Sequence, residues 1–174
     1  MPAPLPPPEL REARLAGRLA ELGIAVTSHE HAPVFTVEEA QALRGSLPGG
    51  HAKNLFLKDK KGGLWLVVAE EARKVGLNAL ARLVGAPRFS FGSPALLGEV
   101  LGVPPGSVSP FALMNDTAGK VRVLLDEALM ALDPVNFHPL RNDRTTAISP
   151  FHLLRFIRAT GHAPVVLALP EADG

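Results

Sequence analysis

The sequence predicts one compact α/β domain, of the α+β kind, in which helices flank a mixed, largely antiparallel sheet or a partly closed barrel. The 174 residues are 47% hydrophobic, which is enough for one core of ordinary domain size. Helical and strand-like segments are intermixed without the regular alternation of a doubly wound fold. No glycine-rich phosphate loop of the Walker or Rossmann kind occurs, which argues against those nucleotide-binding folds.

The helices are indicated by apolar spacing and by their caps. Apolar residues near helical spacing predict a helix over Glu9–Leu22, which ends at Gly23. Thr36-Val-Glu-Glu39 is a capping box that opens a short helix toward Leu43. Further helices are predicted over residues 77–84, from Ser93-Pro94 to Gly102, and from Ser149-Pro150 to Gly161.

The strands centre on one hairpin. Ala52–Lys58 and Leu64–Ala69 are apolar runs joined by Asp59-Lys-Lys-Gly-Gly63, a strong hairpin signal. The chain between Val103 and Phe111 is too rich in proline and glycine for a regular element, so this loop invites a functional explanation. Other short strands are predicted over residues 88–91, 121–125, 135–138, 145–148 and 165–169.

Composition bounds the domain and its surroundings. We expect the domain to span residues 9–169, with loose ends at 1–8 and 170–174. The first eight residues lack the basic start and apolar core of a signal peptide, and no apolar run approaches the roughly 18 residues of a membrane span. The absence of cysteine excludes disulfides, thiolate nucleophiles and cysteine-bound zinc. A soluble cytoplasmic protein with no membrane partner is therefore expected.

Positive charge is concentrated in one stretch. The whole chain has a formal net charge of +1, but residues 53–88 carry eight basic and three acidic side chains. This stretch is a candidate nucleic-acid surface. An ordinary solvated face is the alternative, because no aromatic interleaving supports base stacking.

Two polar side chains stand out as candidates for a site. Lys53 shares a strand face with Leu55 and Leu57, and an inward-facing ammonium there indicates a bound anion such as a substrate phosphate. The alternative is an edge lysine that reaches solvent. His138, in a polar segment after a predicted strand, is placed to orient a water or to hydrogen-bond a ribose or carbonyl; a structural histidine is the alternative.

Other chemistry is indicated less strongly. The loop from Gly106 to Pro110 is suited to presenting backbone N–H groups to a carbonyl or oxyanion, although an ordinary surface turn fits equally well. His29 and His31 lack a third ligand at diagnostic spacing, so no metal site is expected. The serines, including Ser109, lack the context of a nucleophile elbow, which argues against a serine triad.

Several motifs, in this order and with these separations, carry a resemblance. They are His31-Ala-Pro-Val-Phe-Thr-Val-Glu-Glu-Ala40, His51-Ala-Lys-Asn-Leu-Phe-Leu-Lys58, Gly106-Ser-Val-Ser-Pro-Phe111 and Asn136-Phe-His-Pro-Leu-Arg-Asn142. Together they resemble the bacterial trans-editing deacylases of the YbaK and ProX type, from Leu10 through Val166. We find no linker to a synthetase body, so a stand-alone protein is expected.

The resemblance implies a domain related to the editing insertion of bacterial prolyl-tRNA synthetases, which hydrolyses the ester between an amino acid and the terminal adenosine. It implies neither metal nor cofactor. Lys53, His138 and the loop around Gly106 are then expected to anchor the terminal phosphate or ribose, fix the substrate and hold the carbonyl region. The substrate-binding residues expected beside them are Asn54, Val34, Phe35, Ser109, Pro110 and Asn142.

The motifs are more similar to the alanine-specific ProX branch than to the cysteine-specific YbaK branch. We therefore expect mischarged Ala-tRNA(Pro) as substrate, bound directly or delivered by prolyl-tRNA synthetase or an elongation factor. Two alternatives stay open at this point: a deacylase for cysteine or another small amino acid, and a non-catalytic nucleic-acid-binding module of the same fold. The sequence leaves the oligomeric state open.

Overall fold

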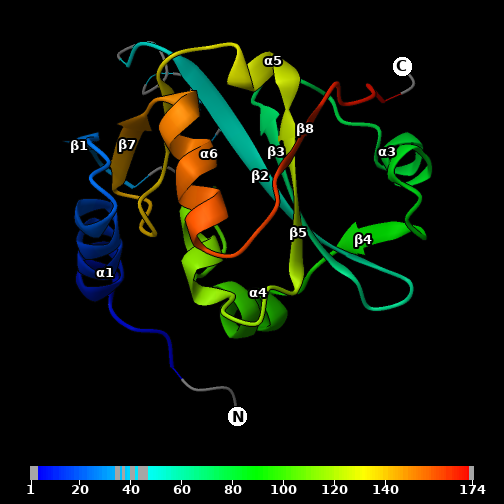
Figure 1. The fold of residues 1–174 in the computed structure, drawn as a ribbon, viewed down its shortest axis with the longest axis horizontal. Coiled ribbons are helices and arrows are strands. Elements are labelled where there is room, and N and C mark those ends of the chain that lie inside the picture. Colours follow the sequence, from blue (N-terminus) through cyan, green and yellow to red (C-terminus); the bar gives the residue numbers. More distant parts are fainter. Residues whose placement is uncertain (1–3, 34–35, 37, 40–41, 43–46, 173–174) are drawn as a thin grey trace.

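Figure 1 shows the computed structural model, which describes residues 4–33, 36, 38–39, 42 and 47–172. In this part of the chain, eight strands form one sheet in the order β1-β7-β6-β2-β3-β5-β8, with β4 also paired to β2. The strands are β1 (Thr27–Glu30), β2 (Gly50–Asp59), β3 (Leu64–Glu70), β4 (Phe89–Phe91), β5 (Val121–Asp126), β6 (Val135–Phe137), β7 (Arg144–Ile148) and β8 (Val165–Leu167). The helices are α1 (Pro8–Glu21), α3 (Leu77–Val84), α4 (Pro94–Leu101), α5 (Glu127–Met130) and α6 (Pro150–Ala159), with a 3₁₀ helix η1 (Pro110–Asn115).

The sheet is mixed, as predicted. The pairs β1–β7, β2–β3, β2–β4 and β6–β7 are antiparallel, whereas β2–β6, β3–β5 and β5–β8 are parallel. No described helix is long and apolar enough to cross a membrane.

Strand β2 joins the two halves of the sheet and leaves an opening on one edge. One edge pairs with β3 from Ala52 to Lys58. On the other edge, Gly50 and His51 pair with β6, and residues 57–59 pair with β4. No described strand pairs with residues 53–55 on that second edge. This gap in strand pairing, here called the opening, lies along β2 between the end of its pairing with β6 and the start of its pairing with β4.

Apolar burial on both faces of the sheet holds these elements together. The larger core lies under α1, α4, α6 and η1, where the Phe111 ring meets Phe137 and Phe156 edge-on at centroid distances of 5.9 and 5.5 Å. The smaller core lies under α3 and includes Leu57 and Trp65. The two faces of β2 therefore pack into different cores.

The predicted helices and strands agree with the structure to within a few residues. Local signals explain this agreement: Ser93 and Ser149 cap α4 and α6 by accepting hydrogen bonds from Leu96 N and His152 N. Glu39 N donates to Thr36 Oγ1, which is half of the predicted capping box, although the helix beyond it toward Leu43 falls outside the described residues.

Three elements were not predicted from the sequence. Strand β1 is exposed at every position, so it carries no apolar alternation, and it forms through its ladder with β7. Helix α5 has only four residues and is started by the Asp126 side chain, which accepts from Ala128 N. The 3₁₀ helix η1 begins at Pro110, inside the loop that looked irregular.

Candidate active site

The strand register places Lys53 of β2 and His138, the residue after β6, beside the same opening. His51 pairs with Asn136 in the parallel β2–β6 ladder, and Lys53 and His138 each lie two residues further along. Phe137 points into the larger core. Lys53 therefore lies on β2 at the opening, and His138 directly follows the end of β6 that bounds it.

Lys53 is a half-buried cation without a neutralising partner. No hydrogen bond or ion pair joins its ammonium to another residue that the structure describes. A partly desolvated ammonium that lacks an internal counter-ion attracts an anionic group of a ligand. The position thus suits the anchoring role expected for Lys53.

His138 is held as a neutral hydrogen-bond acceptor. Its Nδ1 lies 2.8 Å from the carbonyl oxygen of Arg144, and a carbonyl only accepts, so Nδ1 carries the proton. Burial, reinforced by the nearby His31, lowers the pKa of His138 below its ordinary value of 6.5, against the opposing effect of the bond to Arg144. The Nε2 atom therefore keeps its lone pair, and no residue that the structure describes donates a hydrogen bond to it.

Gly106 lies beside Asn142, so the predicted loop meets the β6–β7 turn. Gly106 has φ +89°, a conformation that favours glycine, and a Cβ placed on it would stand 3.9 Å from Asn142 Nδ2. The turn is held by the two neighbours of Asn142 in the chain, since Arg141 Nη2 donates a hydrogen bond to Asp143 Oδ2 at 2.8 Å. Two segments that are distant in sequence are thus adjacent at the end of β6.

Asn54, Ser109 and Pro110 do not share the face of Lys53. The alternation of β2 turns Asn54 toward the larger core with Phe56, and Ser109 and Pro110 are buried where η1 begins. The Oδ1 atom of Asn54 and the Oγ atom of Ser109 are buried and have no hydrogen-bond partner among the described residues. Buried polar atoms usually bind protein groups, water or ligand, so these two atoms remain candidates for substrate contact.

Sequence reasoning missed two residues beside the site. Asn136, 5% exposed, donates from Nδ2 to the carbonyl oxygens of Pro48 and Gly50 at 3.0 Å each, which fixes the chain entering β2. His31 contacts the strand that holds His138. Both lie within the motifs that carried the resemblance, but neither motif indicates a role for them. The expected pocket residues Val34 and Phe35 lie outside the described residues.

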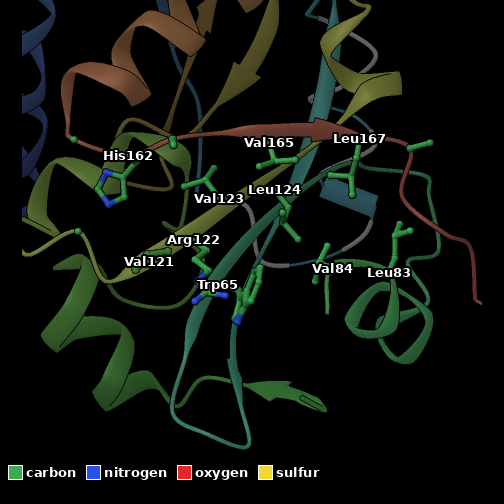
Figure 2. A pocket seen from close by; sticks show the side chains of 14 residues that line it. Trp65, Leu83, Val84, Val121, Arg122, Val123, Leu124, His162, Val165 and Leu167 are labelled. Atoms are coloured by element: carbon green, nitrogen blue, oxygen red, sulfur yellow. The ribbon is translucent and has the colours of Figure 1, made fainter. Parts of the chain in front are cut away.

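A separate cavity of about 810 Å³ lies in the other half of the sheet. Figure 2 shows Leu124 of β5 at its centre, with Val84 of α3 and Val165 of β8 on its sides. The guanidinium of Arg122 lies 4.9 Å from the centroid of the Trp65 ring within it. Among its described lining residues, none belongs to the predicted site. The candidate active site is therefore distinct from this cavity.

Comparisons with known proteins agree with the resemblance. Residues 31–156 match the model of the aminoacyl-tRNA editing domain family. The chain is similar to the bovine (Bos taurus) prolyl-tRNA synthetase associated domain-containing protein 1, with 43% identity over 91% of this chain and 95% of the relative. It is also similar to the prolyl-tRNA editing protein ProX of Acetoanaerobium sticklandii, with 36% identity over 83% of this chain and 89% of the relative.

A solved structure supports the fold. A candidate trans-editing enzyme for prolyl-tRNA synthetase superposes with a TM-score of 0.70 and 24% identity, over 93% of this chain and 98% of that one. The mixed sheet flanked by helices, predicted from the sequence, is thus confirmed.

Proposed function

Because the chain belongs to the aminoacyl-tRNA editing domain family, we propose that it is a stand-alone deacylase that hydrolyses the ester of mischarged Ala-tRNA(Pro) in the cytoplasm. One observation carries this proposal: Lys53, a half-buried ammonium with no counter-ion among the described residues, and His138, an imidazole whose pKa is lowered by burial, lie beside the same opening in the sheet. A cation and a hydrogen-bond acceptor are the groups needed to anchor a phosphate and a ribose hydroxyl.

The proposed chemistry needs no covalent nucleophile. An aminoacyl ester is an activated bond, so placing it beside a water and stabilising the developing charge is enough for hydrolysis. Lys53 anchors the terminal phosphate or ribose. His138 Nε2 accepts a hydrogen bond from a ribose hydroxyl or the attacking water, and backbone amides near Gly106 hold the ester carbonyl. The vicinal ribose hydroxyl helps to activate the water.

A basic end of the sheet suits the rest of the tRNA. The pairing of Asp59 with Phe89 and of Leu64 with Val121 gathers exposed cations at one end of β2, β4 and β5. Asp59 also lies at this end, and its carboxylate accepts hydrogen bonds from Lys61 N, Gly63 N and Trp65 Nε1. The exposed cations, here called the basic end, are Lys58, Lys60, Lys61, Arg88, Lys120 and Arg122.

The distance of the basic end from the opening suggests which part of the RNA it contacts. Lys60 lies seven residues beyond Lys53, or about 23 Å at roughly 3.3 Å per residue along a strand. A terminal nucleotide held at Lys53 does not reach that far. We therefore propose that the basic end binds phosphates further up the acceptor arm.

The discriminating experiment measures release of labelled amino acid from Ala-, Cys- and Pro-charged tRNA(Pro) by the purified chain alone. We expect fast release of alanine and little release of proline, because a small pocket excludes the larger correct residue. Preferred release of cysteine would move the chain to the other substrate branch. Absence of release from all three would contradict a deacylase and favour a binding module.

A further inference from the structure

His31 makes two hydrogen bonds to residues 143–145 and packs beside the His138 ring. It follows β1, and its backbone N donates to the carbonyl oxygen of Asp143 at 3.0 Å. Its Nε2 lies 2.8 Å from Thr145 Oγ1, and its ring centroid lies 5.9 Å from that of His138. Thr145 is only 4% exposed, so its hydroxyl is fixed by this bond and not by solvent. His31 thus fastens the beginning of β7.

The same stretch of β7 holds His138. The carbonyl oxygen of Arg144 accepts from His138 Nδ1 at 2.8 Å, and Arg144 lies between the two residues that His31 contacts. A displacement of residues 143–145 would therefore move the acceptor that sets the tautomer of His138. The sequence gives no sign of this arrangement, because β1 is recognisable only from its pairing.

The hydrogen-bond pattern also defines the tautomer of the neutral His31 ring. Its Nδ1 lies 2.8 Å from the carbonyl oxygen of Ala32, so Nδ1 carries a proton. In the neutral ring Nε2 is then an acceptor, and the Thr145 hydroxyl donates to it. Each of the two neighbouring imidazoles, His31 and His138, is thus anchored through Nδ1 to a backbone carbonyl.

We infer that His31 and Thr145 are positioning residues that hold the His138 imidazole in one place and one tautomer, with Nε2 free to accept a hydrogen bond. The geometry stands by itself, whereas the catalytic consequence rests on the proposed function. Neither residue touches the substrate in this account. Both act through His138, by holding its backbone partner and by flanking its ring.

The charges around His138 make the role of His31 measurable. Lys53 lies beside the same opening. Asp143 and Arg144 lie in the turn and strand that follow His138, Glu30 pairs with Arg144, and the His31 ring packs against that of His138. Through their charges, His31 lowers the pKa of His138 and Asp143 raises it. His31→Phe removes an imidazole that opposes the protonation of His138 when it is itself protonated, so this substitution should raise the pKa of His138.

The test combines histidine NMR with deacylation kinetics on the full chain. His31→Phe keeps an aromatic ring, Thr145→Val removes only the hydroxyl, and Thr145→Ser restores it. Thr146→Val is the matched control, because Thr146 Oγ1 makes an equivalent 2.7 Å bond with Ser28 Oγ on the opposite face of the same strands. His152→Ala is the histidine control, because His152 lies on α6 and its ring packs against that of Phe151.

We expect His31→Phe to raise the pKa of His138 and Thr145→Val to populate its second tautomer. Each change should lower kcat about 10-fold with little change in KM, Thr145→Ser should recover most of the rate, and both controls should match the wild type. Folded variants that keep the wild-type pKa, tautomer and kcat would overturn the inference. If the wild type hydrolyses no aminoacyl-tRNA, the proposed function fails, and the NMR measurements alone decide the positioning role.

Discussion

The neutrality of His138 is the residue-scale property on which the proposed chemistry depends. Burial, aided by the neighbouring His31, holds the pKa of His138 below 6.5, and the bond from Nδ1 to the Arg144 carbonyl leaves Nε2 as the acceptor. Protonation at Nε2 converts this acceptor into a donor, which cannot receive a proton from a ribose hydroxyl or water. Activity should therefore be lost as the pH falls through the lowered pKa.

This argument predicts the pH profile of deacylation. The rate constant at saturating Ala-tRNA(Pro) is first corrected for spontaneous ester hydrolysis. It should stay constant down to pH values below 6.5, the ordinary pKa of a histidine side chain, and decline only at more acidic pH. His138→Gln should lack this acid limb and work at least about 10-fold more slowly at neutral pH. An acid limb above 6.5 in the wild type would show that His138 is not the group that the profile reports.

Residue types explain how much of the site could be foreseen. Lys53 and His138 stood out because a lysine among leucines and a histidine after a strand are unusual in themselves. The roles expected of Asn54 and Ser109 came from the family resemblance, whereas the loop at Gly106 was also indicated by its glycine and prolines. His31 could not be foreseen as a contact of Thr145, because 114 residues separate them and their meeting depends on the β1–β7 ladder.

At the scale of elements, α1 braces the turn that carries Asn142. The Arg11 side chain, 9% exposed, donates from Nε to the Leu140 carbonyl oxygen at 2.8 Å. Glu12, on the next position of α1, forms ion pairs with Arg141 and Arg144. Leu140 adopts φ +65°, which is unfavourable for a side chain with a Cβ, so the turn needs such outside support. The N-terminal helix thus contributes to the geometry of the site.

Removal of one charge tests this brace. Glu12→Gln loses two partly buried ion pairs and should lower the free energy of unfolding by about 1–2 kcal/mol in urea titrations. It should also lower deacylation, because residues 140–144 lose a support. Glu21→Gln makes the same change on the same helix in an exposed pair with Arg18 and should cost at most about 0.5 kcal/mol. Equal effects of the two substitutions would argue against the brace.

Elements with strong local signals were foreseen, and those that depend on distant partners were not. The β2–β3 hairpin and the capped helices α4 and α6 carry turn and cap residues at the right spacing. The opening beside residues 53–55 cannot be predicted in this way. It exists because β6 ends at Phe137 and β4 begins its pairing only at Leu57, and both facts depend on pairings across the sheet.

In the whole molecule, the opening beside Lys53, where we propose that hydrolysis takes place, is separate from the basic end. The molecule carries a formal net charge of only +1, so this local concentration of cations, and not the overall charge, would attract the RNA. Lys60 and Lys61 lie exposed in the turn between β2 and β3, where a substitution should leave the core intact. Binding and chemistry should therefore be separable by mutation.

Reversal of both charges tests this separation. The double variant Lys60→Glu, Lys61→Glu should bind tRNA(Pro) at least about 10-fold more weakly, and the slope of log affinity against log salt should shrink by roughly one for each lost phosphate contact. Hydrolysis of a small aminoacyl-adenosine ester, which does not reach the basic end, should be unchanged. An unchanged affinity and salt slope would place the RNA on another surface.

The measurement that tests the account most directly is the hydrolysis of Ala-tRNA(Pro) by the wild type, Lys53→Ala and Lys74→Ala. Lys74 is exposed and its backbone carbonyl binds Ala172 N near the C-terminus, so it serves as a matched lysine outside the site. We predict rapid release of alanine by the wild type and by Lys74→Ala, and a loss of at least about 100-fold in Lys53→Ala, because the substrate loses its anchor. A wild-type rate no faster than spontaneous hydrolysis, or equal rates in all three proteins, would contradict the account.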